Sequence, residues 1–283
     1  IDGPGSEYER KIAAASPQEG PLPGAGQDEV AMLVYSSGTT SEPKGAMHSH
    51  RTLVLGALRL SNEMRLQTRQ RFFGCLPFFF AGAQSTMTAP LLRGCTLMIA
   101  EFDPLQFLRA VAGEGVSATV MVPTMINRVV EAAGQAKEVP AGMRSWTYGG
   151  APMPESDLTR ATAAFGPVFT QFYGQVETGL LATVLHPEDH IGGRGLMPRL
   201  RSVGRPAIGA RVRLVSPGGG EDAATGSPAE ITVRSDSIML GYWRQPELTA
   251  ETIKDGWVYT GDLALADDEG FVFVVDRLTE MII

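Results

Sequence analysis

Short apolar runs alternate with stretches of helical periodicity between about residues 30 and 176. Apolar strands are predicted at residues 31–35, 46–48, 96–100, 118–122, 145–148 and 168–173. Ser49 and the Asp103-Pro104 pair are N-terminal signals for two helices, the first running to about Met64. Further helices are predicted at residues 123–133 and 154–165. Strand–helix–strand units with apolar strands predict an α/β fold, in which a largely parallel sheet is flanked by helices.

The pattern changes beyond about residue 203, where helical periodicity is no longer found. Strands are predicted at residues 212–215, 231–234 and 271–275, separated by turn clusters such as residues 216–220. The acidic run at residues 267–270 is expected to form a hairpin turn. This part predicts a small antiparallel β-barrel or sandwich without helices. Residues 1–29 are rich in Pro, Gly, Glu and Ala without apolar periodicity, which is typical of a surface linker.

Composition and charge narrow the class of protein. The 283 residues are 43% hydrophobic and 19% charged, so a full hydrophobic core is expected. The formal net charge of −7 argues against binding to a nucleic-acid backbone. Only two cysteines occur, which favours a reducing, cytoplasmic setting. The longest apolar stretch (72–83) is too short to cross a bilayer, so no transmembrane segment is expected. Because the chain starts at Ile1 and stops inside an apolar run, we expect it to be part of a longer protein.

The polar run at residues 36–45, Ser-Ser-Gly-Thr-Thr-Ser-Glu-Pro-Lys-Gly, is the sharpest chemical feature of the sequence. Glycines let backbone N–H groups approach an anion, hydroxyls donate further hydrogen bonds, and Lys44 adds a positive charge. These properties predict a phosphate-binding loop. It differs from a Walker A loop, because the lysine precedes the last glycine. On composition alone, an ordinary Ser/Thr/Gly hairpin loop is the alternative.

Two further motifs carry candidate ligand groups. Residues 169–179 continue a predicted strand to the edge of the sheet where α/β proteins bind ligands. They offer the Tyr173 ring for stacking and the Glu177 carboxylate for Mg²⁺. Residues 257–262 place Asp262 after a turn, where its carboxylate could accept hydrogen bonds from a ribose diol. Taken alone, Tyr173 is more often a core residue and Asp262 a turn aspartate.

Together these motifs resemble those of the adenylate-forming superfamily of acyl-CoA synthetases, firefly-type luciferases and peptide-synthetase adenylation domains. Six runs match in order from about residue 28 onward: SSGTTSEPKG (36–45), YGGAP (148–152), YGQVET (173–178), SVGRP (202–206), YTGD (259–262) and DRLTEMI (276–282). The VPTMINR and YGGAPMP runs look most like bacterial fatty-acyl-CoA ligases. The resemblance implies that a further N-terminal stretch and a C-terminal lid domain of the family are absent from this chain.

The resemblance also divides the chain into parts. Residues 1–29 would be a linker and the end of the missing N-terminal region, and residues 30–66 the phosphate-loop hairpin and its helix. Residues 67–200 would form the α/β subdomain with the acyl and adenine sites. Residues 201–276 would form the small β-barrel subdomain, and residues 277–283 would begin the hinge.

Individual site residues follow from the same resemblance. The phosphates of ATP would be bound by Ser36, Ser37, Gly38, Thr39, Thr40, Ser41 and Lys44, of which Thr39, Thr40 and Lys44 would take part in catalysis with Glu177. The rest of the nucleotide would be bound by Gly150, Ala151, Pro152, Gln171, Tyr173, Gly174, Gln175 and Val176. Asp262 and Arg277 would hold the ribose hydroxyls, and Glu177 would coordinate Mg²⁺. The acyl group would contact Phe80, Gly149 and Gly150.

Four positions depart from the family pattern. Ser41 replaces the usual glycine of the phosphate loop, and Val176 stands where threonine usually contacts the α-phosphate. Losing that charge-assisted hydrogen bond would cost about 1.5–3 kcal/mol. Phe80 occupies a position often held by histidine near the acyl site, and Thr279 replaces the usual Asp or Lys of the hinge.

The resemblance implies an ATP-dependent acid–thiol ligase that forms an acyl-AMP intermediate and uses ATP, Mg²⁺ and coenzyme A. Segments expected around the acyl group, residues 72–92, 145–154 and 166–176, carry no Asp, Glu, Lys or Arg. An apolar acid, fatty or aromatic, is therefore predicted. Residues 78–82 lack the aspartate with which peptide-synthetase domains bind an amino group, which disfavours an amino acid. A nucleotide-binding pseudoenzyme and an adenylation domain that loads a carrier protein are the alternatives.

Overall fold

A seven-stranded mixed sheet forms the base of the molecule. The computed structural model describes residues 6–15, 24–36, 43–80, 82–136, 139–190, 199–216, 221–223 and 226–278. The strand order is β4-β3-β5-β6-β7-β8-β9, with parallel pairing from β4 to β7 and antiparallel pairing at β8 and β9. The strands are β3 (Arg71–Gly74), β4 (Thr96–Ile99), β5 (Val116–Met121), β6 (Ser145–Gly149), β7 (Phe169–Tyr173), β8 (Thr183–Leu185) and β9 (Arg205–Pro206). The predicted α/β fold is confirmed.

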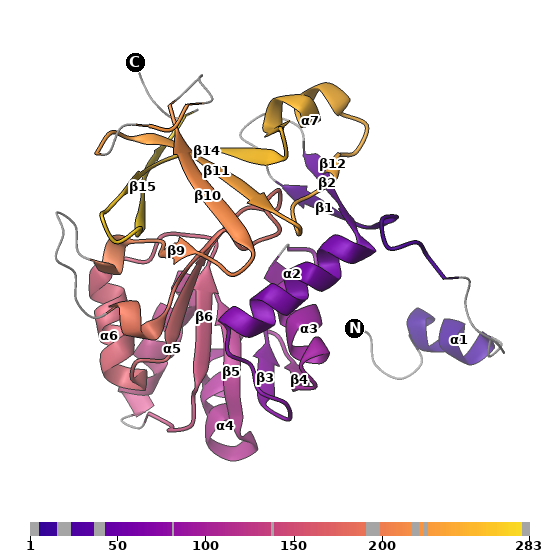
Figure 1. The fold of residues 1–283 in the computed structure, drawn as a ribbon. Coiled ribbons are helices and arrows are strands. Elements are labelled where there is room, and N and C mark those ends of the chain that lie inside the picture. Colours follow the sequence, from indigo (N-terminus) through magenta and orange to yellow (C-terminus); the bar gives the residue numbers. More distant parts are fainter. Residues whose placement is uncertain are drawn as a thin grey trace.

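Helices cover both faces of this sheet (Figure 1). They are α2 (His50–Glu63), α3 (Gly82–Leu92), α4 (Pro104–Glu114), α5 (Pro123–Ala136) and α6 (Glu155–Phe165), followed by the short 3₁₀ turns η1 (Pro187–His190) and η2 (Arg199–Arg201). Phe72 and Phe73 are neighbours on β3, yet they belong to different hydrophobic clusters, because strand side chains alternate between faces. The larger cluster centres on Trp146, whose ring lies 5.0 Å from Phe107 and 5.2 Å from Phe169.

The helix start signals seen in the sequence operate as expected. The Ser49 side chain accepts a hydrogen bond from Thr52 N at 3.2 Å and caps α2. The Asp103 side chain accepts one from Gln106 N at 2.6 Å, and Pro104 is the first residue of α4. Each cap satisfies a backbone N–H that has no partner within its helix. These two starts therefore fix where the chain leaves a strand and turns back along the sheet.

Two antiparallel sheets lie above the base (Figure 1). One contains β10 (Ala210–Val215), β11 (Ala229–Ser235), β13 (Ile253–Lys254), β14 (Trp257–Ala266) and β15 (Val272–Arg277). The other contains β1 (Val30–Ser36), β2 (Lys44–Ser49) and β12 (Gly241–Tyr242). The predicted barrel is thus found only in part, as an open antiparallel sheet in the described residues. The predicted turn is present, since Asp267 Oδ1 accepts from Glu269 N and Phe271 N between β14 and β15.

Three helices differ from the sequence prediction. Helix α7 (Pro246–Thr252) lies in the part expected to lack helices; its seven residues are too few to show a period, and Pro246 at its first turn was the available signal. Helix α1 (Glu7–Ala14) lies in the expected linker, capped by Ser6. All the described side chains of α1 are exposed. The helix therefore has no apolar stripe by which the sequence could have predicted it. Helix α3 was not predicted, because it contains Pro90, a residue that normally ends a helix.

A buried arginine joins the base to the upper sheets. Arg59 of α2 is 9% exposed, and its Nε donates to Ile208 O at 2.6 Å. Its two terminal nitrogens donate to Leu181 O at 2.9 Å, to Ser235 Oγ at 2.8 Å and to Ser237 Oγ. One turn further along α2, Glu63 Oε1 accepts from Ile208 N at 2.6 Å. Helix α2 thereby contacts the turn before β8, the segment before β10 and the end of β11.

Replacing this arginine should destabilise the fold. Arg59→Met leaves the buried carbonyl group of Leu181 and the partly buried carbonyl group of Ile208 without their donor. Such losses cost about 3 kcal/mol of unfolding free energy. Urea denaturation measures the change. Arg109→Met is the control, because that side chain is 73% exposed and its contact with Asp103 should contribute under about 1 kcal/mol. Equal effects of the two substitutions would show that the Arg59 contacts are not stabilising.

Candidate active site

A cavity of about 1560 Å³ lies where the parallel strands of the base end and the upper sheets begin. Gly149 and Gly150 line it at the carboxyl end of β6, and residues 174–177 line it after β7. Lys44 of β2, Gly261 of β14 and Arg277 of β15 line its upper part. The carboxyl ends of parallel strands are the usual ligand-binding edge of an α/β sheet. The fold thus brings together residues from five of the six sequence motifs.

The Asp262 carboxylate is held by three donors from separate elements. Tyr173 Oη donates to its Oδ2 at 2.8 Å, and Gln175 Nε2 donates to the same oxygen at 2.9 Å. Arg277 Nε donates to Oδ1 at 2.7 Å. Asp262 is 4% exposed, so its carboxylate is buried. Burial, and secondarily the Asp262 charge, raises the pKa of the Tyr173 phenol, which therefore keeps the proton it donates.

This network limits how Asp262 could bind a ribose. A carboxylate offers about four acceptor positions, and three are used by protein donors. Two ribose hydroxyls would therefore require one donor to move aside. The Arg277 side chain is 47% exposed, whereas Tyr173 packs against the hydrophobic cluster of the upper sheet. Arg277 is therefore the most exposed of the three donors.

A second buried carboxylate lies in the turn after β7. Glu177 is 9% exposed, lines the cavity and accepts a hydrogen bond at Oε1 from Tyr242 Oη at 2.7 Å. Burial, reinforced by the Glu177 charge, raises the pKa of the Tyr242 phenol, so the phenol remains a donor. Lys44 Nζ lies 5.8 Å from the centroid of the Tyr242 ring. The sequence analysis did not select Tyr242, because a tyrosine after a turn glycine carries no chemical signature of its own.

Glu177 fits a divalent cation by its chemistry. No hydrogen bond from the described residues reaches its second oxygen, Oε2. A carboxylate oxygen of this kind is a hard ligand that Mg²⁺ prefers. In the described part of the chain no group of three or more His, Cys, Asp or Glu gathers to form a metal site without further ligands. A cation at Glu177 would therefore need oxygens from a bound phosphate as well.

Tyr148 and His190 lie beneath the predicted adenine site. Tyr148 Oη is 3.2 Å from Gln171 Oε1 and 3.2 Å from His190 Nε2, and His190 Nδ1 is 2.7 Å from His186 O. Gln171 is 9% exposed. Its carboxamide is therefore oriented by this buried network, although the sequence analysis did not identify Tyr148 or His190 as its partners. Their hydrogen-bonding role could not be read from residue spacing.

Two glycines are required for close backbone approach around the cavity. A Cβ atom at Gly149 would lie 2.5 Å from Phe172 O, and one at Gly174 would lie 2.5 Å from the carbonyl carbon of Leu180. Both distances are shorter than real Cβ contacts, and the opposing atoms belong to the backbone. The glycines of YGGAP and YGQVET therefore have a packing reason at these positions. They let β6 and the turn after β7 approach their neighbours.

The lower wall of the cavity is apolar. Leu60, Leu76, Val120 and Phe172 contribute to it, together with Phe80 beside α3. The Phe80 ring is 58% exposed and lies 4.6 Å from the ring of Phe79. This wall would suit an apolar group, as the uncharged sequence segments predicted.

The predicted site residues divide into three groups. The cavity is lined by Lys44, Phe80, Gly149, Gly150, Gly174, Gln175, Val176, Glu177 and Arg277. Among the described residues, those outside that lining are Ser36, Ala151, Pro152, Gln171, Tyr173 and Asp262, the last two being linked to it through Gln175 and Arg277. Ser37, Gly38, Thr39, Thr40, Ser41 and Thr279 lie outside the described residues. The flanking pair Ser36 and Lys44 is in register in the β1–β2 hairpin.

Comparison with known proteins places this chain in a family. A family model described as "AMP-binding enzyme" matches residues 2–243. The chain is 34% identical over 257 residues to a medium/long-chain-fatty-acid–CoA ligase, FadD8, of Mycobacterium tuberculosis, covering 90% of this chain and 44% of that protein. It is 36% identical over 278 residues to a feruloyl-CoA synthase of Amycolatopsis, covering 96% and 54%. The chain thus spans about half the length of these relatives.

A solved structure agrees with the sequence comparisons. The O-succinylbenzoate coenzyme A synthetase MenE of Bacillus subtilis, in complex with AMP, superposes with a TM-score of 0.81 at 26% identity. The match covers 91% of this chain and 51% of that one. No helix among the described residues has the length and apolar character required to cross a membrane.

Acid should weaken the network beneath the predicted adenine site. Burial lowers the pKa of His190 below the value of 6.5 expected in the unfolded chain. As the pH falls below about 6.5, the unfolded chain binds the proton first, so the free energy of unfolding decreases by up to about 1.4 kcal/mol per pH unit. Urea unfolding at pH 7.5 and 5.5 measures this loss. His190→Gln should lose less stability than the wild type over that interval, and equal losses would contradict the assignment.

Proposed function

Because the chain belongs to the AMP-binding enzyme family, we propose that its cavity activates an apolar carboxylic acid with ATP. The complete protein would be an acid–thiol ligase that forms an acyl-AMP and transfers the acyl group to coenzyme A. The names of the relatives support this reaction class, since they specify CoA ligases or synthases. The observation that carries the proposal is that one cavity has both an apolar wall and a polar wall. Phosphate, ribose and acyl groups would meet there.

The polar wall would hold the nucleotide. Lys44 would place its charge beside the β- and γ-phosphates, with the loop at residues 37–42 supplying further donors. Gly150 would lie against the adenine, and Gln171 would bind its edge from the oriented carboxamide described above. Asp262 and Arg277 would bind the ribose hydroxyls, with the Arg277 side chain moving to admit them. Charge neutralisation and positioning are the main contributions that a protein makes to phosphoryl chemistry.

The apolar wall would hold the tail of the acid. Leu60, Leu76, Val120 and Phe172 offer no charged group to an amine or a second carboxylate. A medium or long aliphatic chain and an aromatic acid are both compatible with it. Phe80 stands at the wall where a polar side chain would have favoured a more polar acid. An apolar fatty or aromatic acid is therefore the proposed substrate class.

The chemistry proceeds in two balanced steps. A carboxylate oxygen of the acid attacks the α-phosphorus of ATP, pyrophosphate leaves, and a mixed acyl-AMP anhydride forms. The thiol of coenzyme A then attacks the acyl carbon, its proton is lost, and AMP leaves with the bridging oxygen. In the first step Lys44 would stabilise the charge that accumulates on the leaving pyrophosphate. The buried position of Glu177 and Asp262 would keep the reacting groups fixed relative to the sheet.

Glu177 would hold Mg²⁺ together with the phosphates. When bound, the cation would offset the negative charge of the triphosphate and orient it. Val176 would leave the α-phosphate without the threonine hydroxyl that the family usually provides. The proposal therefore predicts that turnover depends on Lys44 and Mg²⁺ more heavily here than it does in relatives that have the threonine.

A panel of carboxylic acids scored for pyrophosphate release tests the proposed reaction. Acids of increasing aliphatic length and substituted cinnamic acids should stimulate release, whereas amino acids should not. The assay uses the complete protein with ATP, Mg²⁺ and each acid. Nucleotide binding without acid-dependent release from any acid would instead favour a nucleotide-binding pseudoenzyme. Release with amino acids alone would favour a carrier-protein-loading domain.

Lys44 should discriminate between ATP and AMP. Because AMP lacks the β- and γ-phosphates, Lys44→Ala should weaken ATP about tenfold and AMP less than twofold, as expected from loss of one charge-assisted contact. Calorimetric titration with each nucleotide measures the ratio. Lys11→Ala is the matched control, because that side chain pairs with Glu7 on α1, is 76% exposed and does not line the cavity, so the ratio should stay unchanged. Equal weakening of both nucleotides by Lys44→Ala would refute the role of Lys44.

Asp262 should discriminate ribose from dideoxyribose. The wild type should bind ATP more tightly than 2′,3′-dideoxy-ATP, since the analogue has no hydroxyl to donate. Asp262→Asn keeps the size of the side chain and should reduce this preference by about a factor of ten, the value of one hydrogen bond to a charged group. Competition binding with both nucleotides measures the preference. An unchanged preference in the variant would show that Asp262 does not contact the diol.

A further inference from the structure

Tyr242 stands between two cavities and touches the groups that the proposed function uses. It lines the main cavity, and it also lines a smaller apolar pocket of about 590 Å³ behind β12. The residue is 6% exposed. Its hydroxyl is on the main cavity side, where it bonds Glu177 Oε1 at 2.7 Å. The Lys44 amine lies 5.8 Å from its ring centroid. One side chain therefore contacts both a candidate metal ligand and a candidate phosphate-binding cation.

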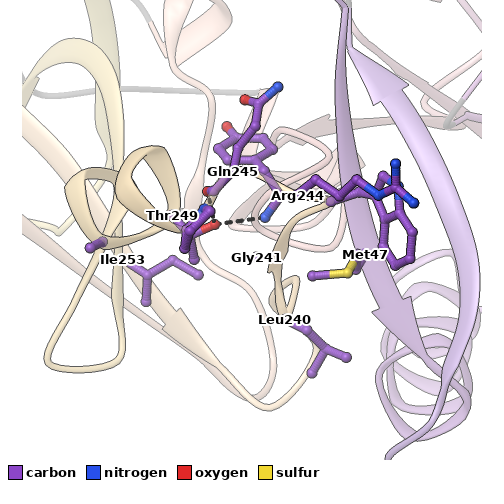
Figure 2. A pocket seen from close by; sticks show the side chains of 11 residues that line it. Met47, Leu240, Gly241, Arg244, Gln245, Thr249 and Ile253 are labelled. Carbon is purple, nitrogen blue, oxygen red and sulfur yellow. Dashed lines mark hydrogen bonds between the residues drawn. The ribbon is translucent and has the colours of Figure 1, made fainter.

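The backbone of Tyr242 is fixed on two sides. It pairs with Ala46 of β2, the strand that Lys44 begins. On the other side Tyr242 N bonds Thr249 Oγ1 at 2.9 Å, and Thr249 Oγ1 donates to Gln245 O at 2.8 Å. Figure 2 shows Thr249 of α7 next to Gln245 and facing Gly241. These contacts leave the tyrosine little freedom to follow Glu177, so the carboxylate is positioned by the tyrosine.

The Tyr242 hydroxyl directs its proton to Glu177 Oε1. Partners that orient a metal ligand in this way are commonly worth 10–100-fold in metal affinity.

We propose that Tyr242 is a positioning residue that orients Glu177 for Mg²⁺ and couples it to Lys44 through the shared strand pair. With one oxygen of Glu177 fixed by the phenol, the second oxygen is presented to a cation in one orientation. The same ring limits the approach of Lys44, so the cation and the lysine act on the triphosphate from fixed places. This inference rests on the proposed function, in which Glu177 serves Mg²⁺ and Lys44 serves the phosphates.

The test is the Mg²⁺ dependence of ATP binding to the full chain. ATP affinity is measured by calorimetry across a Mg²⁺ titration, and the Mg²⁺ concentration at half-maximal effect is compared between variants. Tyr242→Phe should raise that concentration about tenfold, the lower end of the effect of an orienting partner. Its affinity for AMP without Mg²⁺ should stay within about twofold of the wild type, since a single hydroxyl far from the base is removed. Glu177→Gln should raise the concentration at least as much.

Matched variants separate orientation from folding. Tyr259→Phe also removes a phenol hydroxyl from the upper sheets, but that residue has no hydrogen bond to Glu177, so its Mg²⁺ midpoint should not move. Thr249→Val keeps the shape of its side chain and removes the acceptor of Tyr242 N, which loosens the tyrosine, and it should raise the midpoint two- to threefold. If Tyr242→Phe does not fold, this variant still tests whether Tyr242 orients Glu177 for Mg²⁺.

The outcomes distinguish the inference from the function beneath it. A wild-type midpoint in Tyr242→Phe would overturn the inference, and if that variant does not fold, a wild-type midpoint in Thr249→Val would overturn it. A raised midpoint in Glu177→Gln would still leave the proposed function standing. Equal weakening of AMP and Mg²⁺-ATP by Tyr242→Phe would also overturn it, because the residue would then be only structural. An unchanged midpoint in Glu177→Gln would remove the metal role of Glu177 and with it both proposals.

Discussion

The guanidinium of Arg59 is the contact on which the arrangement of the site depends. It carries a buried positive charge whose hydrogen bonds end on carbonyl and hydroxyl oxygens of three distant segments. Such a group is stable only when all its donors are satisfied, so the segments cannot shift separately without a large penalty. Leu181 follows the turn that contains Glu177, and Ser235 ends the strand that lies beside β14. Through Arg59 the sheet that would carry the acid and the sheet that would carry the ribose keep one relative position.

The candidate site is built from carboxylates that are held before any ligand arrives. Asp262 is bonded by three side chains, and Glu177 by one that is itself oriented. Holding charges in fixed positions lowers the reorganisation needed when charge moves during a reaction. Holding the carboxylates in place also has a cost, because the protein donors compete with the ligand for the same oxygens. Asp262 shows this, since three protein donors already bond its carboxylate. The half-exposed Arg277 side chain offers one way to relieve that competition.

The sequence predicted the main sheet well because its signals are local. Ser49 and Asp103 cap their helices through bonds within three residues, and the apolar runs from β5 to β7 are buried on both faces. Helix α7 could not be predicted, since its short length shows no period and its role is to hold Tyr242 by contacts across the chain. The motifs selected Lys44, Glu177 and Asp262 by chemical type. They could not select Arg59, Tyr148 or Tyr242, whose importance lies in distant partners.

The central claim is that an acid is activated as its adenylate, and isotope transfer tests it most directly. An acid labelled with ¹⁸O in both carboxylate oxygens is incubated with the complete protein, ATP, Mg²⁺ and coenzyme A, and the products are analysed by mass spectrometry. If the carboxylate attacks the α-phosphorus, AMP carries one ¹⁸O and pyrophosphate carries none. Label in orthophosphate or pyrophosphate, or thioester formation with unlabelled AMP, would contradict an acyl-AMP intermediate in this cavity.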